Sequence, residues 1–157
     1  MSDPVRATLR ATGLLPVAER AKLRLSRARK IYGADVRSVL RPVSAPDGLP
    51  IPPARLRYFA VGSTDVAGFL DGGRRVAQMI EETLGRNEID MNGLGAMLDF
   101  GVGCGRVARY WKKLEGVGVF GTDYNGDAVA WCSRNLTFGT FTTKDRKSTR
   151  LNSSHRL

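Results

Sequence analysis

The stretch Leu98–Arg106, which reads LDFGVGCGR, places three glycines at alternate positions directly after a short apolar run. That run, Ala96–Phe100, has the length and apolar character of a buried strand. Glycine lets the chain turn tightly between a strand and a helix, and it lets a bound molecule approach the backbone because no side chain intervenes. Amides at the start of the following helix can donate to a negatively charged group. The stretch therefore predicts a ligand-binding loop over Gly101–Gly105.

Downstream of this loop the sequence alternates between helix and strand patterns. The expected elements are, in order, a helix over Val107–Leu114, a strand over Val117–Thr122, a helix over Asp127–Leu136 and a strand over Phe138–Thr142. Strands that alternate with helices form parallel sheets with right-handed crossovers. The expected fold class is therefore α/β, with a Rossmann-like parallel sheet and a helical N-terminal extension.

A second acidic residue strengthens the interpretation of the glycine loop. The string GTDYN places Asp123 at the end of the second expected strand, 18 residues after Gly105 and 24 after Asp99. A carboxylate in this position can accept hydrogen bonds from both hydroxyls of a ribose. It could instead cap the next helix. Loop, helix, strand and terminal acid together predict a nucleoside-binding unit.

The glycine spacing leaves a nicotinamide-dependent oxidoreductase open as an alternative. A dinucleotide fingerprint requires Gly-x-Gly-x-x-Gly. Counted from Gly101, the last position falls on Arg106, and counted from Gly103 it falls on Ala108. Alanine is sometimes accepted there, but that register leaves Asp99 without a role.

The spacing from Asp99 to Gly105 resembles motif I of class I S-adenosylmethionine-dependent methyltransferases. The string GTDYN resembles their acidic motif at the second strand. The similarity is to a bacterial group of small methyltransferase-domain proteins; it covers about Leu56–Phe141 and includes the upstream FLDGGRR, Phe69–Arg75. It implies a class I methyltransferase fold, methyltransferase activity and S-adenosyl-L-methionine as the cofactor.

The resemblance also implies which residues bind the cofactor. The expected cofactor-binding residues are Asp99, Gly101, Gly103, Gly105, Asp123, Tyr124 and Asn125. The glycines would line the methionine part and the sugar. Asp99 would orient the loop and the cofactor's amino group, and Asp123 would hold the ribose hydroxyls. Tyr124 and Asn125 would lie near the adenine edge. The methyl acceptor, a general base and the oligomeric state are not assigned, because later strands supply the acceptor site in this family.

The net charge of +10 is concentrated at the two ends of the chain. Residues 1–57 hold 12 Lys and Arg against 4 Asp and Glu, residues 58–144 hold 9 against 10, and residues 145–157 hold 4 against 1. The sequence shows no interleaving of aromatic and basic residues, which argues against nucleic acid as the partner. A non-enzymatic protein that binds through its basic N-terminal segment remains a second alternative.

The N-terminal part predicts a basic helix followed by a linker. Val17–Tyr32 is expected to be helical, with Gly33 as its stop. Five apolar residues are spaced to share one face: Val17, Ala21, Leu25, Ala28 and Tyr32. Such a helix either binds an anionic surface or partner, or is a solvated helix that flanks a domain. Five of the seven prolines lie between Pro42 and Pro53, which predicts an extended linker.

The patterns and the resemblance together predict three segments: a basic helical extension with a proline-rich linker over 1–57, a partial methyltransferase domain over 58–144, and a non-native tail over 145–157. At the start of the second segment, a helix is expected to be capped by Ser63 or Thr64, to break or kink at Gly72–Gly73 and to stop at Gly85. Asn92–Gly93 is expected to form a turn.

The tail from Asp145 to His155 resembles the translation of a short-read sequencing adapter. The expectation is that the natural protein continues beyond about Lys144. The 157-residue chain is then an inactive fragment, poorly stable alone because part of its sheet is missing. The single histidine, His155, lies in this tail and receives no catalytic role.

Other classes of protein are not supported by the sequence. No apolar run reaches the roughly 18 residues of a membrane span, and the N-terminus lacks the apolar region of a secretory signal. Cys104 and Cys132 do not make a disulfide framework and lack metal-ligand spacing, so no metal site is expected. The expected location is the reducing cytoplasm.

Overall fold

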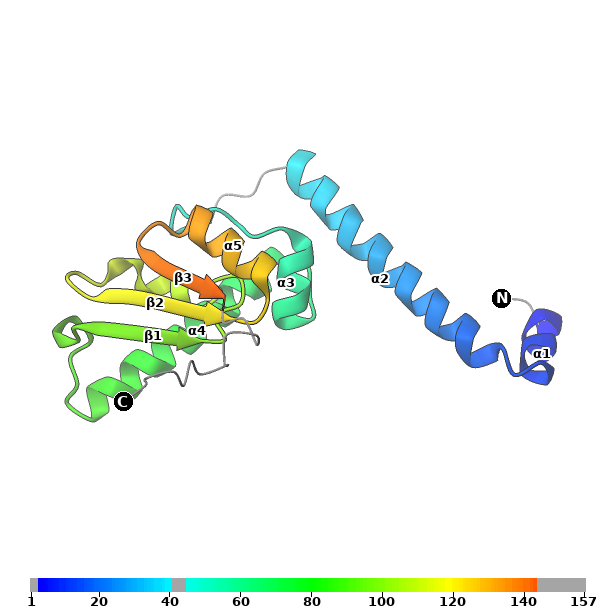
Figure 1. Cartoon of the computed structure of the whole chain (residues 1–157), viewed down its shortest axis with the longest axis horizontal. Coiled ribbons are helices and arrows are strands. Elements are labelled where there is room, and N and C mark those ends of the chain that lie inside the picture. Colours follow the sequence, from blue (N-terminus) through cyan, green and yellow to red (C-terminus); the bar gives the residue numbers. More distant parts are fainter. Residues whose placement is uncertain (1–2, 41–44, 144–157) are drawn as a thin grey trace, which may run out of the picture. The chain divides into compact units, whose positions relative to one another are not determined.

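The computed structural model describes residues 3–40 and 45–143, and the chain divides into two compact units, Met1–Pro42 and Val43–Leu157 (Figure 1). The first unit contains the helices α1 (Asp3–Ala11) and α2 (Leu15–Leu40). Arg6 Nη2 lies 3.4 Å from Glu19 Oε1, so an ion pair joins the two helices. The expected helical N-terminal part is thereby confirmed, whereas the tail over 145–157 lies outside the described residues.

The expected stop at Gly33 is wrong, because α2 continues to Leu40. A glycine inside a helix costs only about 1 kcal/mol relative to alanine. Ala34, which follows it, is buried, and the next proline is Pro42. The local penalty at Gly33 is therefore too small to end the helix.

The second unit is an open parallel sheet with helices. Its elements are α3 (Ala54–Val61), α4 (Val66–Arg86), η1 (Met91–Gly93), β1 (Ala96–Phe100), η2 (Ala108–Lys113), β2 (Gly118–Asp123), α5 (Gly126–Asn135) and β3 (Gly139–Thr143). The strand order is β1-β2-β3, with both neighbouring pairs parallel. The predicted α/β fold with a Rossmann-like parallel sheet is confirmed.

The strands and helices after the glycine loop lie close to their expected positions. The strand β1 has the expected bounds, and β2, α5 and β3 begin within one residue of theirs. The element after the loop differs in type, because η2 is a 3-10 helix rather than an α-helix. Residues 45–53 contain no helix or strand, as the proline content indicates.

The helix α4 differs from its expected form at both ends and in the middle. Its N-cap is Asp65, whose carboxylate accepts from the Gly68 amide at 2.6 Å, and not Ser63 or Thr64. The helix runs unbroken through Gly72–Gly73 and ends at Arg86, one residue beyond Gly85.

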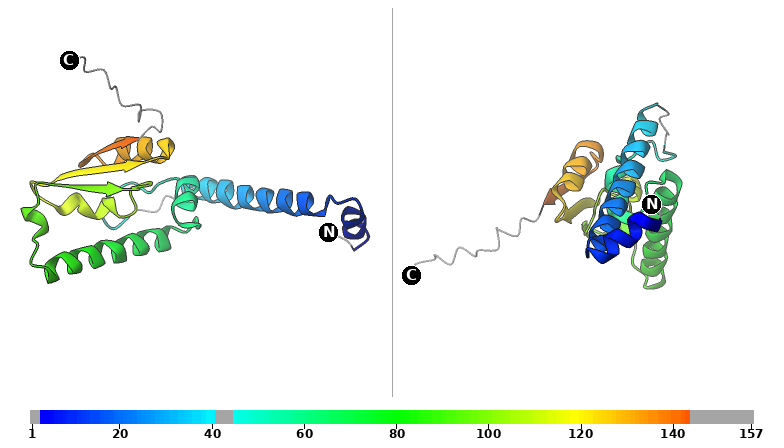
Figure 2. Two further views of the ribbon diagram at one scale, coloured as in Figure 1. Left: turned by 60° about the horizontal axis from the view of Figure 1, so that its bottom comes forward. Right: turned by 90° about the vertical axis from the view of Figure 1, so that its right-hand side faces the viewer.

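The core lies on one face of the sheet. The buried residues Val119, Gly121 and Phe141 occupy this face, and Trp111 of η2 and Trp131 of α5 belong to the same apolar cluster. The helix α5 packs on β2 and β3, while η2 lies between the sheet and α4 (Figure 2). On the opposite face, the three apolar side chains of Leu98, Phe100 and Phe120 are exposed.

Across residues 3–40 and 45–143, no helix combines the length and the apolar character that crossing a bilayer requires.

Candidate functional site

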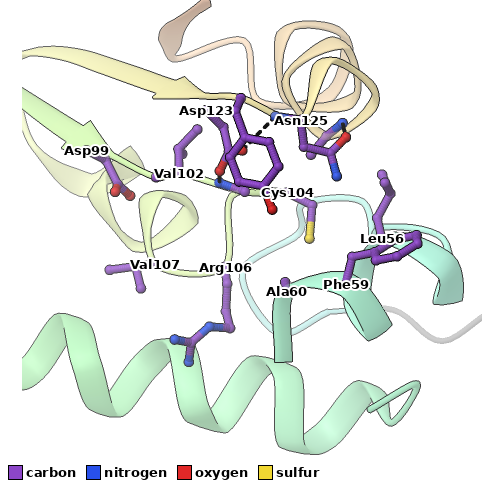
Figure 3. Close-up of a pocket in the computed structure, with 14 residues that line it drawn as sticks. Leu56, Phe59, Ala60, Asp99, Val102, Cys104, Arg106, Val107, Asp123 and Asn125 are labelled. Carbon is purple, nitrogen blue, oxygen red and sulfur yellow. Dashed lines mark hydrogen bonds between the residues drawn. The ribbon is translucent and has the colours of Figure 1, made fainter. Parts of the chain in front are cut away.

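The second unit carries a cavity of about 270 Å³ at the carboxyl ends of β1 and β2 (Figure 3). Its walls come from α3, from the glycine loop and from the segment that follows β2. Ligands of open α/β sheets usually bind at this edge. The volume is close to the lower end of the range for small-molecule sites.

Most of the residues singled out by the sequence meet at this cavity. Six of them line it: Asp99, Gly101, Gly103, Asp123, Tyr124 and Asn125. The seventh, Gly105, does not line the cavity. A Cβ atom there would lie 2.3 Å from Leu136 Cδ1, so Gly105 faces α5 and permits its close packing. Its φ of +75° also favours glycine.

The glycine loop turns over the end of β2. The Gly101 and Val102 amides both donate to the Thr122 carbonyl, at 2.8 and 3.1 Å. Gly101 and Gly103 have φ of +84° and +55°, values that L-residues with side chains rarely adopt. A Cβ atom at Gly101 would meet nothing within 4 Å. The loop therefore leaves open space beside its backbone.

The Asp123 carboxylate closes the site from the end of β2. Its Oδ2 accepts from the Gly103 amide and its Oδ1 from the Asn125 amide, each at 2.8 Å. The N-cap of α5 is Asn125 and not Asp123: the Asn125 side chain accepts a hydrogen bond from the Ala128 amide at 3.3 Å. Each carboxylate oxygen has two acceptor positions. Asp123 thus keeps acceptor capacity for a ligand after bonding both amides.

Asp99 is half-buried at the cavity and accepts no hydrogen bond from any described residue. Its pKa is raised above the usual 3.8, mainly by burial and secondly by the neighbouring Asp123 charge. The Arg106 guanidinium opposes this rise. An unpartnered carboxyl group in this environment is suited to a cationic ligand group.

Arg106 brings a positive charge to the same cavity. It forms no ion pair with the acids of the described segments. Its backbone carbonyl would lie 2.1 Å from a Cβ atom at Gly73, and its Nη1 would lie 3.1 Å from one at Gly72. Gly73 thus makes room for the backbone of the loop that holds Arg106, whereas at Gly72 only the tip of the Arg106 side chain lies near.

The wall formed by α3 was not predicted from the sequence. Leu56, Phe59 and Ala60 of this helix line the cavity (Figure 3). The helix has only eight residues, too few for a helical period to stand out in the sequence. Two signals could have located it, namely Pro53 at its N-cap and Gly62 in the left-handed conformation at its end.

Two buried arginines hold this wall and its preceding segment in place. Arg57 donates through Nη2 to the Thr64 carbonyl at 2.7 Å and also to the Pro52 carbonyl. Arg109 donates to both Asp47 carboxylate oxygens, at 2.5 and 2.8 Å. Partial burial of Asp47 opposes ionisation, yet hydrogen bonding to Arg109 and Leu49 holds its pKa below the usual value. Arg57 thus ties together the segments before and after α3, whereas the Arg109 guanidinium ties residues 47–49 to η2.

Both cysteines are buried and free. Burial raises the pKa of Cys104 to about 11 and that of Cys132 to about 12. A thiol with so high a pKa is a poor nucleophile at neutral pH. Although Cys104 lines the cavity, its properties are those of a small apolar residue.

The chain matches no family model and no curated protein. Among solved structures, part of it is similar to a TehB-like SAM-dependent methyltransferase from Corynebacterium glutamicum ATCC 13032 Kitasato. The sequence identity is 23% and the TM-score 0.30, and the match covers 48% of this chain and 46% of that one. The chain therefore spans about half the length of the structure that it matches.

Proposed function

We propose that residues 58–144 form the S-adenosylmethionine-binding part of a class I methyltransferase. The observation that carries this proposal is one cavity lined by two aspartates at the ends of adjacent strands, Asp99 and Asp123, with open glycine backbone between them. A nucleoside with a charged tail needs such an arrangement. One acid accepts from the sugar hydroxyls, the other attracts a cation, and the bare backbone allows close approach.

The charges of the site fit this cofactor. The methionine part of S-adenosylmethionine carries an ammonium, a sulfonium and a carboxylate. The unpartnered Asp99 is suited to the ammonium group, and the Arg106 guanidinium is suited to the carboxylate. The remaining acceptor positions of Asp123 would take the ribose hydroxyls. Tyr124, which is 87% exposed, and Asn125 would lie along the adenine edge.

Catalysis in such a site depends on position more than on proton transfer. When bound, the cofactor supplies a methyl group already activated by its sulfonium. The task of this chain is then to orient that group and to exclude water around it. Asp123 would fix the sugar, Asp99 would fix the amino end, and the α3 wall with Phe59 would cover one side. Under this proposal the described residues bind the cofactor and none of them is assigned to the methyl acceptor, so the 157-residue chain is expected to be inactive by itself.

The dinucleotide alternative has less support from the geometry. A nicotinamide cofactor places its pyrophosphate on the N-terminus of the helix after the loop. Here that element is the six-residue 3-10 helix η2. In the dinucleotide register that begins at Gly103, Gly105 would let the pyrophosphate approach the protein backbone. In the structure Gly105 faces α5 instead. Asp99, which that register leaves without a role, lines the cavity.

Equilibrium dialysis against S-adenosylhomocysteine and against NADH tests the proposal. We expect binding of S-adenosylhomocysteine and none of NADH. Asp123→Ala should weaken binding by about 10- to 100-fold, because it removes charge-assisted hydrogen bonds. Asp127→Ala is the matched control: it removes the same charge near the start of α5, outside the cavity. It also breaks the ion pair of Asp127 with Arg55, but that pair is solvent-exposed and contributes little, so affinity should stay within about twofold.

The milder Asp123→Asn separates binding from folding. It keeps one side-chain acceptor for the Gly103 amide, and circular dichroism reports whether the fold is retained. Its affinity should lie between those of the parent chain and Asp123→Ala. Tight binding of NADH, or equal loss in the Asp127 and Asp123 variants, would contradict the proposal.

A further inference from the structure

The helix α2 presents an apolar stripe along one side. At 100° per residue, Val17, Leu25, Tyr32 and Val36 fall within an arc of about 100°. The small residues Ala21 and Ala28 lie in the same arc. The stripe extends over about 28 Å at a rise of 1.5 Å per residue. It is therefore wide and long enough to lie along an apolar surface.

The stripe is exposed in the structure. The exposed fractions are 57% for Val17, 72% for Leu25, 68% for Tyr32 and 58% for Val36. A single exposed apolar residue needs no explanation, whereas a contiguous row marks an interaction surface. Four large side chains on one arc make such a row.

Positive charges border the stripe on both sides. On the same helical wheel Arg20 and Arg24 lie along one edge, and Lys22 and Arg29 lie along the other. All four are exposed, and none pairs with an acid of residues 3–40 or 45–143. Of the two acids of α2, Glu19 is paired with Arg6 of α1. The other, Asp35, falls at the same wheel angle as Val17, on the edge of the stripe beside Arg24. The surface thus combines an apolar centre with a cationic border.

We propose that α2 binds the surface of a membrane rich in anionic lipid, with its apolar stripe in the acyl boundary and its cations at the headgroups. An apolar face bordered by lysine and arginine is the pattern of helices that lie in the plane of such an interface. The long side chains of Arg24 and Arg29 can reach outward to phosphate while their stems stay in apolar surroundings.

Two other occupants suit the surface less well. A second copy of α2 could cover the stripe, but the cationic borders of the two helices would then face each other, and like charges repel at such contacts. Nucleic acid would satisfy the cations but would leave the stripe in water, and α2 has only one aromatic residue, Tyr32, for stacking on bases.

Vesicle flotation with the complete 157-residue chain tests the proposal. Vesicles of pure phosphatidylcholine are compared with vesicles that contain about one third phosphatidylglycerol. We expect binding only to the anionic vesicles, and weaker binding at high salt. Leu25→Ser should weaken binding at least about tenfold, because it removes a large apolar side chain from the buried arc.

Matched variants on the back of α2 separate this surface from general charge and hydrophobicity. Leu23→Ser changes an exposed leucine that lies opposite the stripe, and we expect its vesicle binding to be unchanged. Arg24→Gln and Arg29→Gln should each weaken binding about fivefold, and Lys30→Gln on the back face should weaken it less. Circular dichroism of each variant without vesicles shows whether α2 is retained.

Several outcomes would overturn the proposal. One is equal binding to both kinds of vesicle, or equal loss in Leu23→Ser and Leu25→Ser. Another is a dimer in sedimentation that Leu25→Ser dissolves, without vesicle binding, which would identify a second copy as the occupant. A third is tight binding of duplex DNA that Leu25→Ser leaves unchanged. Protection of the stripe side chains from hydroxyl-radical labelling without vesicles would mean that another part of the chain covers them.

Discussion

The two faces of the three-stranded sheet differ in what covers them. On one face Phe141 is only 7% exposed, and Val119 and Gly121 are buried beside it. On the other face Phe100 is 77% exposed, and Leu98 and Phe120 lie open as well. Alternating residues of the same strands supply both sets. The difference shows that the covering helices, rather than the composition of the strands, determine which apolar residues form the core.

The largest expected effect separates the two faces directly. Phe141→Ala should destabilise the second unit by about 3–5 kcal/mol, because it leaves a cavity among the side chains that pack between sheet and α5. Phe100→Ala removes the same atoms from the open face and should change stability by less than about 0.5 kcal/mol. Urea unfolding followed by tryptophan fluorescence measures both. Equal losses would mean that both faces contribute to the core in solution.

A smaller effect is expected where α4 meets the glycine loop. Gly73→Ala should cost about 1–3 kcal/mol, because its Cβ atom would lie 2.1 Å from the Arg106 carbonyl oxygen and the backbone would have to move. Gly85→Ala in the same helix meets nothing within 4 Å and should stabilise by about 0.5–1 kcal/mol. Thermal unfolding of the two variants gives the comparison. If Gly73→Ala is also stabilising, the backbone of α4 does not pack closely against the glycine loop in solution.

The smallest expected effect concerns Asp99, which lies near the carboxyl end of β1 on the covered face of the sheet and lines the cavity. Its pKa is raised in the structure, so its carboxylate gains a proton at a higher pH than an ordinary aspartate, with its usual value of 3.8. Under the proposed function, the ionised form attracts the cofactor's ammonium group. Affinity for S-adenosylhomocysteine should therefore fall as the pH drops through that raised pKa, by about tenfold.

Asp99→Asn supplies the control for this pH dependence. The amide carries no charge at any pH, so affinity should be lower at neutral pH and should no longer fall at the acid end of the range. Isothermal titration across the pH series makes the comparison with the parent chain. An unchanged pH profile in Asp99→Asn would assign the titration to another group.

The sequence predicted the sheet well because its signals there are local. The bounds of β1 and the positive-φ glycines after it follow from a short apolar run and an alternating glycine pattern. Six of the seven expected site residues line one cavity because the ends of adjacent parallel strands must lie side by side. The methyltransferase role of these residues stays a prediction.

The sequence misled where tertiary contacts outweigh local preference. Gly72–Gly73 indicated a break or kink, but Gly73 serves a close backbone contact with Arg106 that no local pattern reveals. The place of Gly105 against Leu136 depends on α5, more than 20 residues further along the chain. The wall supplied by α3 depends on the buried bonds of Arg57, which connect segments on either side of that helix.

The attachment of residues 45–49 through Arg109 has a consequence for how the molecule assembles and opens. The Arg109–Asp47 contact joins positions 62 residues apart, so forming it closes a long loop and carries the entropic cost of that closure. Strand pairing does not depend on it. Loss of this bond would release the stretch ahead of α3 as a cooperative element while the β-ladder stays intact, as in native-state amide exchange. Detachment of this stretch and global unfolding are thereby separate events with separate free energies.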